Sequence, residues 1–140
     1  AELTRVHEVG EAPSGDSPHQ TIAGKVIPKG VMVFRVFGAF FFGAADKLET
    51  ALRRAEQLPD VLILRMRDVL TIDATGLDAL EDLLEKLRIK KKDLILCAPH
   101  SQPLFALTRV GLIDKIGMDN ICGDLDAALE RAQQILAAKK

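Results

Sequence analysis

Two short, continuous apolar runs constrain the fold of this chain more than any other feature of its sequence. The runs are VLIL at residues 61–64 and LILCA at residues 94–98, each of strand length and without a polar residue. Strands buried on both faces have this composition, and they occur mainly in parallel sheets. The leucines between the runs recur at helical spacing, and they are Leu77, Leu80, Leu83, Leu84 and Leu87. This strand–helix–strand order predicts parallel strands joined by right-handed crossovers.

The flanking segments extend the same alternation. Residues 43–58 and 125–136 carry apolar residues at helical spacing, and Asp124 stands at the N-cap position of the second segment. A brief helix is expected over 101–111 and a short fifth strand around 120–122. The order of elements therefore predicts an α/β fold with a largely parallel sheet of about five strands.

The amino-terminal part departs from this alternation. Two apolar segments flank Pro28-Lys29-Gly30, where Pro at the second and Gly at the fourth position suit a type I turn. We therefore predict a β-hairpin over 21–38, which adds an antiparallel strand and makes the sheet mixed. Residues 1–20 contain a cluster of Pro, Ser and Gly that is typical of a linker arm. The folded domain is then expected over 21–138.

Composition and spacing exclude several kinds of function. The chain has 140 residues, a net charge of −1 and neither Trp nor Tyr, which argues against nucleic-acid binding. Cys97 and Cys122 form no CxxC pair and are expected to be buried thiols. His7, His19 and His100 lack metal-ligand spacing, so no metal site is predicted. Because no P-loop, GxGxxG, GxSxG or Cys-His signature is present, no catalytic residue is predicted and the chain is not expected to be an enzyme.

The stretch TIDATGLDAL, residues 71–80, contains the main candidate site. Asp73 precedes the leucine face, so its carboxylate is expected to cap the helix, a more common role than a chemical one. Thr75 follows in the first turn, near free N–H groups that favour phosphate. Gly76 costs helix stability and therefore suggests a close approach of the backbone to a neighbouring strand or a partner.

Two further features have alternative interpretations. Phe40, Phe41 and Phe42 are consecutive, so they cannot all point into one core. They indicate either two buried rings with one exposed or an aromatic edge that docks another surface. The run RIKKK at 88–92 suits a helix C-terminus through the helix dipole, and this explanation is favoured over nucleic-acid or lipid binding.

Taken in order, the VLIL strand, DATGLDAL, the leucine-faced helix and LILCAP resemble the STAS domain. This family includes bacterial anti-sigma factor antagonists and the cytoplasmic C-terminal domains of SulP-family sulfate and anion transporters. The segments at 30–48 and 108–132 resemble the transporter branch, in which a glycine-led strand precedes paired Phe residues. The resemblance covers about residues 20–138 and implies helices packed mainly on one face of the sheet.

The resemblance also implies a function. We expect a non-catalytic regulatory domain at the cytoplasmic face of the cell membrane, in an integral membrane transporter for sulfate or a related anion. Its partners would be the transmembrane anion-transport domain of the same polypeptide and cytosolic regulatory proteins. Contact with the membrane is expected only through that transmembrane part. Some relatives bind nucleotides weakly near this loop, but no cofactor is assigned to this chain.

The alternative is a free-standing signalling module similar to the anti-sigma factor antagonists. In those proteins a phosphorylated Ser directly follows the loop Asp. Here that position is Ala74, which has no hydroxyl, and Thr75 matches the next position. The phosphorylation switch is therefore not carried over, and Asp73, Ala74, Thr75 and Gly76 are expected to form a regulatory or recognition loop.

Overall fold

The computed structural model describes residues 6–9, 27–40, 50, 53 and 58–139. Its strands are β1 (Val6–Val9), β2 (Val31–Phe40), β3 (Val61–Ile72), β4 (Asp93–Cys97) and β5 (Ile121–Cys122). Its helices are α2 (Ala74–Ile89), α3 (Ser101–Arg109), α4 (Leu112–Ile116) and α5 (Leu125–Ala138), with a 3₁₀ turn at Met118–Asn120. The helix predicted over 43–58 lies mostly outside the described residues.

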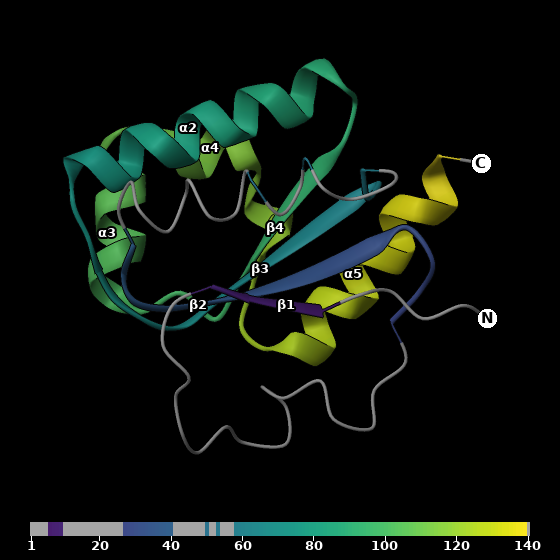
Figure 1. The fold of residues 1–140 in the computed structure, drawn as a ribbon, viewed down its shortest axis with the longest axis horizontal. Helices are drawn as coiled ribbons and strands as arrows, with labels where there is room; N and C mark the ends of the chain where they lie inside the picture. The colour runs from purple at the N-terminus through teal and green to yellow at the C-terminus, as the bar shows by residue number, and fades with distance from the viewer. Residues whose placement is uncertain (1–5, 10–26, 41–49, 51–52, 54–57, 140) are drawn as a thin grey trace.

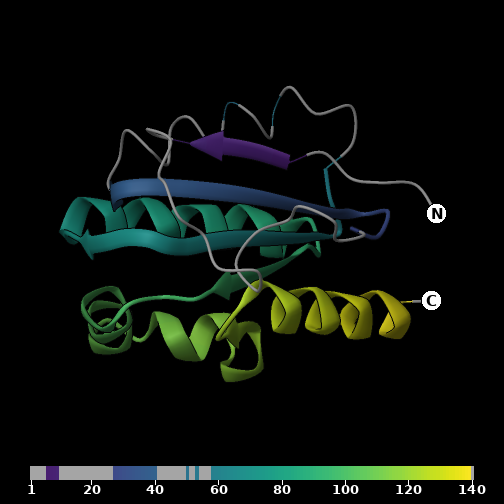
Figure 2. The same ribbon diagram turned by 90° about the horizontal axis from the view of Figure 1, so that it is seen from below.

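The sheet has the order β1-β2-β3-β4-β5, and each neighbouring pair of strands is parallel. The α/β fold with a largely parallel sheet of about five strands is therefore confirmed. Figure 2 shows β1, β2 and β3 side by side, with α5 beyond them. The first strand of the expected hairpin falls mainly on residues 21–26, which lie outside the described part of the chain. Residues 33–35 of β2 pair with β1 on one side and β3 on the other, both parallel, so the predicted antiparallel pairing with β2 is wrong there.

The turn before β2 differs from the type I turn predicted at Pro28. The N–H of Val31 donates to the Pro28 carbonyl oxygen at 3.2 Å, so the turn begins one residue later than expected. Gly30 stands at its third position with φ +91°, a value that a type II turn requires and that glycine adopts without strain. The prediction relied on the preference of Pro for the second position of a turn. The positive φ of Gly30 instead sets the position and type of this turn.

Strand β1 lies within residues 1–20, the segment expected to be a linker arm. Its register pairs Val6 with Val33 and Val9 with Val36. The linker prediction did not include this strand because VHEV is too short to show a clear period-two pattern. The Pro/Ser/Gly cluster that motivated the prediction lies outside the described residues.

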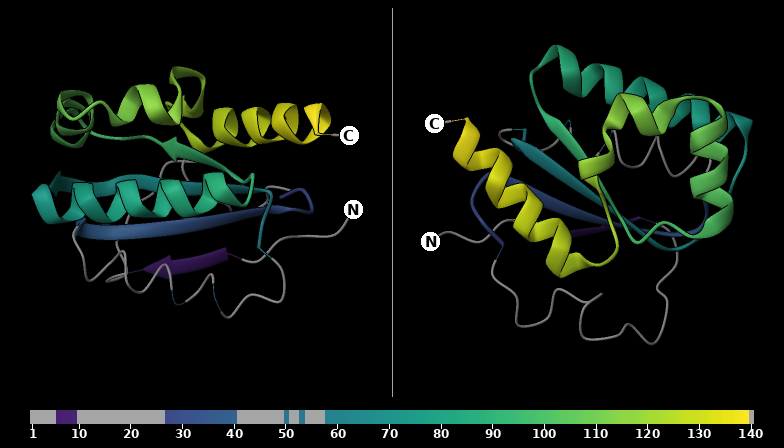
Figure 3. Two further views of the ribbon diagram at one scale, coloured as in Figure 1. Left: turned by 90° about the horizontal axis from the view of Figure 1, so that it is seen from above. Right: turned by 180° about the vertical axis from the view of Figure 1, so that it is seen from behind.

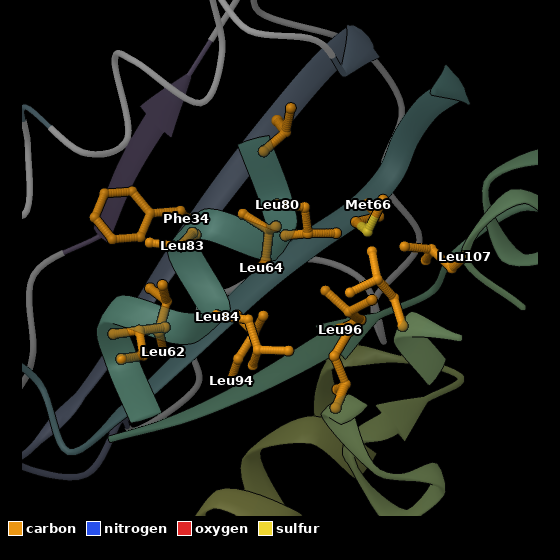
Figure 4. Close-up of a cluster of buried hydrophobic side chains, with 14 of the residues drawn as sticks. Phe34, Leu62, Leu64, Met66, Leu80, Leu83, Leu84, Leu94, Leu96 and Leu107 are labelled. Atoms are coloured by element: carbon orange, nitrogen blue, oxygen red, sulfur yellow. The ribbon is translucent and has the colours of Figure 1, made fainter. Parts of the chain in front are cut away.

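Alternate residues of the strands enter two separate apolar clusters on opposite faces of the sheet. The first contains Phe34, Leu62, Leu64 and Leu96 and packs against α2, α3 and α4 (Figure 4). The second contains Val33, Ile63, Ile95 and Cys97 and packs against α5. Most described helices thus cover one face, as expected, while α5 covers the other (Figure 3). Full burial of each Leu, Ile or Val contributes about 1.5–3 kcal/mol, so both clusters are major sources of stability.

Strand β3 continues well beyond the VLIL run that predicted it. It remains paired with β2 up to the register pair Phe40–Ile72, and irregularities interrupt the pairing after Arg35 and Gly38. Met66 and Val69 keep the strand in the core, while the carboxylate of Asp68 lies 3.7 Å from the guanidinium of Arg35. The extra length places the start of α2 at one end of the domain, shown at the left of Figure 1.

Candidate functional site

Asp73 connects the end of β3 to the start of α2 and caps that helix. Its backbone is extended, with φ −99° and ψ −179°, and its Oδ1 accepts a hydrogen bond of 2.8 Å from the N–H of Gly76. The Asp73 carbonyl oxygen also accepts a 2.9 Å bond from Leu77. This geometry satisfies first-turn donors that lack partners inside the helix. The predicted capping role of Asp73 is therefore confirmed.

The first turn of α2 is divided between solvent and protein. Asp73, Ala74 and Thr75 are exposed, whereas Gly76 is buried. The Thr75 side chain is exposed to solvent. In the same turn, the N–H of Gly76 already donates its hydrogen bond to the carboxylate of Asp73.

Helix α3 is attached to the same loop through one side-chain amide. Gln102 Oε1 accepts a 2.9 Å hydrogen bond from the N–H of Ile72, and Gln102 Nε2 donates to the Ile72 carbonyl oxygen at 3.4 Å. The amide thus pairs with the backbone at the end of β3, as a neighbouring strand would. Nearby, Nε2 of His100 donates to the carbonyl oxygen of Arg67. These contacts fix α3 against the carboxyl end of β3.

A small open cavity of about 350 Å³ lies between the start of α2 and α3. It is lined by Ile72, Ala74, Leu77, Gln102, Ala106, Arg109 and Val110. Most of these side chains are apolar, and Arg109 and Gln102 supply polar groups. An apolar lining with a few polar groups is typical of binding surfaces.

Large apolar side chains are exposed on α3 and at its end, and one of them, Val110, lines this cavity. Phe105 is 64% exposed and Val110 is 52% exposed, and Leu104 is also partly exposed. The Arg109 guanidinium lies 5.9 Å from the centre of the Phe105 ring, within the range of a cation–π contact. We call Ala74, Thr75, Leu104, Phe105 and Val110 the loop–α3 surface.

The sequence did not identify the part of this surface that α3 contributes. The pattern over 101–111 predicts only a brief helix and assigns no role to Phe105. The available signal was that Phe105 is the one Phe outside residues 34–42. Of the predicted aromatic edge, the backbone of Phe40 pairs with Ile72, one residue before Asp73. Phe41 and Phe42 lie outside the described residues.

The two cysteines are buried thiols, as predicted, and they are adjacent in the register of β4 and β5. Burial raises the pKa of Cys97 to about 12, and the nearby Arg65 opposes this rise only partly. Burial also raises the pKa of Cys122. Both remain protonated near neutral pH, and a protonated thiol is a poor nucleophile.

The described part of the chain offers neither a cluster of metal-ligating side chains nor a helix that could span a membrane. In it, no three His, Cys, Asp or Glu side chains come together as a metal ion would require. The helices described there are all too short or too polar to cross a lipid bilayer.

Comparison with known proteins shows that this chain is similar to sulfate transporters and to a domain of a SulP transporter. A sulfate transporter family protein from Wolinella succinogenes is 38% identical, with a TM-score of 0.79 over 87% of this chain and 99% of that one. The STAS domain of a SulP transporter from Vibrio cholerae is 26% identical, with a TM-score of 0.72 over 83% of this chain and 91% of that one.

A putative sulfate transporter of Bacillus subtilis is 29% identical over 84% of this chain. The chain spans 21% of the length of that curated relative. The family model for the STAS domain matches residues 24–128. With its parallel sheet, its capped loop at Asp73 and this match, the chain belongs to the STAS domain family.

Proposed function

We propose that this chain is the non-catalytic regulatory domain of a secondary transporter for sulfate or a related anion, at the cytoplasmic face of the cell membrane. Three of its relatives are sulfate or SulP transporters by name, which supports the transported class. The domain would be joined to the transmembrane anion-transport part of the same polypeptide. Its role would be to modulate transport and to bind cytosolic regulatory proteins.

The observation that carries the regulatory part of this proposal is the loop–α3 surface. Val110 exposes a large apolar side chain in the cavity wall that it shares with Ala74, and Phe105 exposes another against Arg109, which lines the same cavity. Exposed apolar groups that gather around a cavity mark interaction sites, because their burial against a partner is favourable. Gln102 holds α3 to the end of β3 through two hydrogen bonds, so this surface is preformed.

The free-standing signalling module is the less favoured function. A phosphate on Thr75 would lie close to the carboxylate of Asp73, which already accepts the Gly76 N–H. Repulsion between these two negative groups disfavours a phosphorylated state. Incubation with cognate kinase, followed by mass spectrometry, would detect phosphate on Thr75 if the chain were such a module.

The proposal is tested on the whole reading frame that encodes this chain. That frame should encode membrane-spanning helices before the STAS domain, and its expression should give uptake of radiolabelled sulfate or a related anion. A frame truncated before residue 21 should still reach the membrane but show altered uptake. A frame without membrane-spanning helices, or a truncation that leaves uptake and its regulation unchanged, would contradict the proposal.

A further inference from the structure

The end of the domain opposite the loop–α3 surface gathers basic side chains from three elements. Helix α2 ends there at Ile89, and the chain enters β4 through Lys90, Lys91 and Lys92. Helix α5 ends beside them, since Nζ of Lys139 donates to the Lys91 carbonyl oxygen at 2.7 Å. Figure 1 shows the ends of α2 and α5 at the right, at the same end as the start of β1.

Carboxylates at this end neutralise only part of the positive charge. Asp60 forms an ion pair of 3.0 Å with Lys92, and Asp93 forms one of 3.1 Å with Lys139. Arg88, Lys90 and Lys91 are exposed, and none of the three has an ion pair with another described residue. We call Arg88, Ile89, Lys90 and Lys91 the basic end.

An exposed apolar side chain lies within this charge cluster. Ile89 stands between Arg88 and Lys90 and is 78% exposed. Cations around an apolar side chain suit a bilayer interface, where headgroups carry negative charge and the acyl boundary accepts apolar groups. Nucleic acid offers phosphates as well, but the basic end has no aromatic side chain that could stack on bases.

The conformation of Lys91 is a second, independent observation. Its φ is +60°, in the left-handed region that favours glycine. It follows the helix cap Lys90 in a Schellman motif, with Lys91 N–H bonded to Arg88 O at 2.9 Å and Lys92 N–H to Leu87 O at 2.8 Å. A glycine would adopt this conformation at a lower energetic cost, so a lysine at this position adds charge to the basic end at some cost in folding stability.

From these observations we propose that the basic end binds anionic phospholipid headgroups, with Ile89 inserted at the bilayer surface. The inference rests on the proposed function for its location, because a membrane part preceding Val6 would join β1 at this same end. It goes beyond the expectation that the domain meets the membrane only through the transporter part. The lipid contact would fix the orientation of the domain beneath the membrane.

The test uses the 140-residue chain and sedimentation with lipid vesicles. The chain should bind vesicles of equal parts phosphatidylcholine and phosphatidylglycerol, and binding should weaken as salt is raised. The triple variant Arg88→Gln, Lys90→Gln and Lys91→Gln should bind at least about tenfold more weakly. A control with the same charge change, Arg53→Gln, Arg109→Gln and Lys115→Gln, should bind like the unmodified chain.

A second variant separates bilayer insertion from attraction to charge. Ile89→Ser keeps every charge and should weaken vesicle binding several-fold, because the inserted side chain is lost. Circular dichroism would show that each variant is folded. Any one of four results would overturn the proposal. These are equal binding to neutral vesicles, an equal loss of vesicle binding in both triple variants, unchanged vesicle binding of Ile89→Ser, and tighter binding to a DNA duplex than to vesicles. Since no transport is measured, failure here is distinguishable from failure of the proposed transporter role.

Discussion

The side-chain amide of Gln102 forms two hydrogen bonds with the backbone of Ile72, at 2.9 Å from the Ile72 nitrogen and 3.4 Å from its carbonyl oxygen. The two residues are 30 positions apart, and this contact helps to hold α3 against the loop at Asp73. The loop–α3 surface thus depends on an interaction between distant parts of the sequence.

Replacement of Gln102 by Ala should therefore loosen this end of the domain. The partly buried N–H of Ile72 loses its acceptor, which costs about 1–3 kcal/mol of unfolding free energy. Hydrogen exchange at the Ile72 amide should become faster, while exchange in α5 should change little. The matched control is Gln102→Glu, which keeps a hydrogen-bond acceptor. The Ile72 amide should therefore exchange more slowly in this variant than in the Ala variant. Equal protection of Ile72 in the Ala variant would show that the amide contact does not hold the strand end.

Removal of the Asp73 carboxylate should weaken the start of α2. The variant Asp73→Ala leaves the Gly76 N–H without its 2.8 Å acceptor and should lower the free energy of unfolding by about 1 kcal/mol. The variant Asp73→Ser retains a capping oxygen and should lose less. Urea unfolding followed by circular dichroism measures both. Complete loss of the folded state in Asp73→Ala would mean that this residue does more than cap the helix.

Glycine at position 91 should stabilise the domain. The left-handed conformation with φ +60° costs lysine roughly 1 kcal/mol that glycine does not lose, so Lys91→Gly should raise the free energy of unfolding by about that amount. Lys90 has φ −91°, so Lys90→Gly should give no gain and serves as the control. A drop in stability for Lys91→Gly, measured by urea unfolding, would contradict this assignment of strain.

The buried thiol of Cys97 should make stability depend on pH in the alkaline range. Burial raises its pKa from the ordinary thiol value of 9.0 to about 12 in the folded domain, so the unfolded chain releases this proton first. The contribution is fully present below pH 9 and is lost as the pH rises from 9 towards 12. Between pH 8 and pH 10 the free energy of unfolding should fall by about 1 kcal/mol from this thiol.

The control for this pH effect is Cys97→Ala under reducing conditions. Although less stable at pH 8, this variant should show a smaller decrease between pH 8 and pH 10, and urea unfolding at the two values measures it. An equally steep decrease in the Ala variant would assign the alkaline loss to other groups. Cys122, whose pKa is also raised by burial, contributes in the same direction in both proteins.

Local patterns predicted the elements whose own residues determine their structure. The VLIL and LILCA runs became the buried parts of β3 and β4, and Asp73 and Asp124 cap the helices as expected. The elements that were missed depend on distant partners. Strand β3 extends to Ile72 because β2 continues to pair with it past Arg65, where the apolar run has ended.

The candidate site shows the same contrast between features encoded locally and features that depend on distant contacts. The sequence identified Asp73 and the exposed turn of α2, because an N-cap is encoded within a few residues. It did not identify Phe105 or the cavity between α2 and α3, because these depend on the contact between Gln102 and Ile72. A helix of nine residues such as α3 has too few turns to show which of its apolar side chains will stay exposed.

The most direct test of the central claim is uptake of radiolabelled sulfate by cells expressing the full reading frame with Phe105→Ser. The matched control is Met118→Ser, which changes an apolar side chain of similar exposure, 69% against 64%, outside the loop–α3 surface. We expect Phe105→Ser to change the rate or regulation of uptake at equal membrane abundance, with Met118→Ser unchanged. Uptake that is identical in both variants and in the unmodified protein would contradict a regulatory role for this surface.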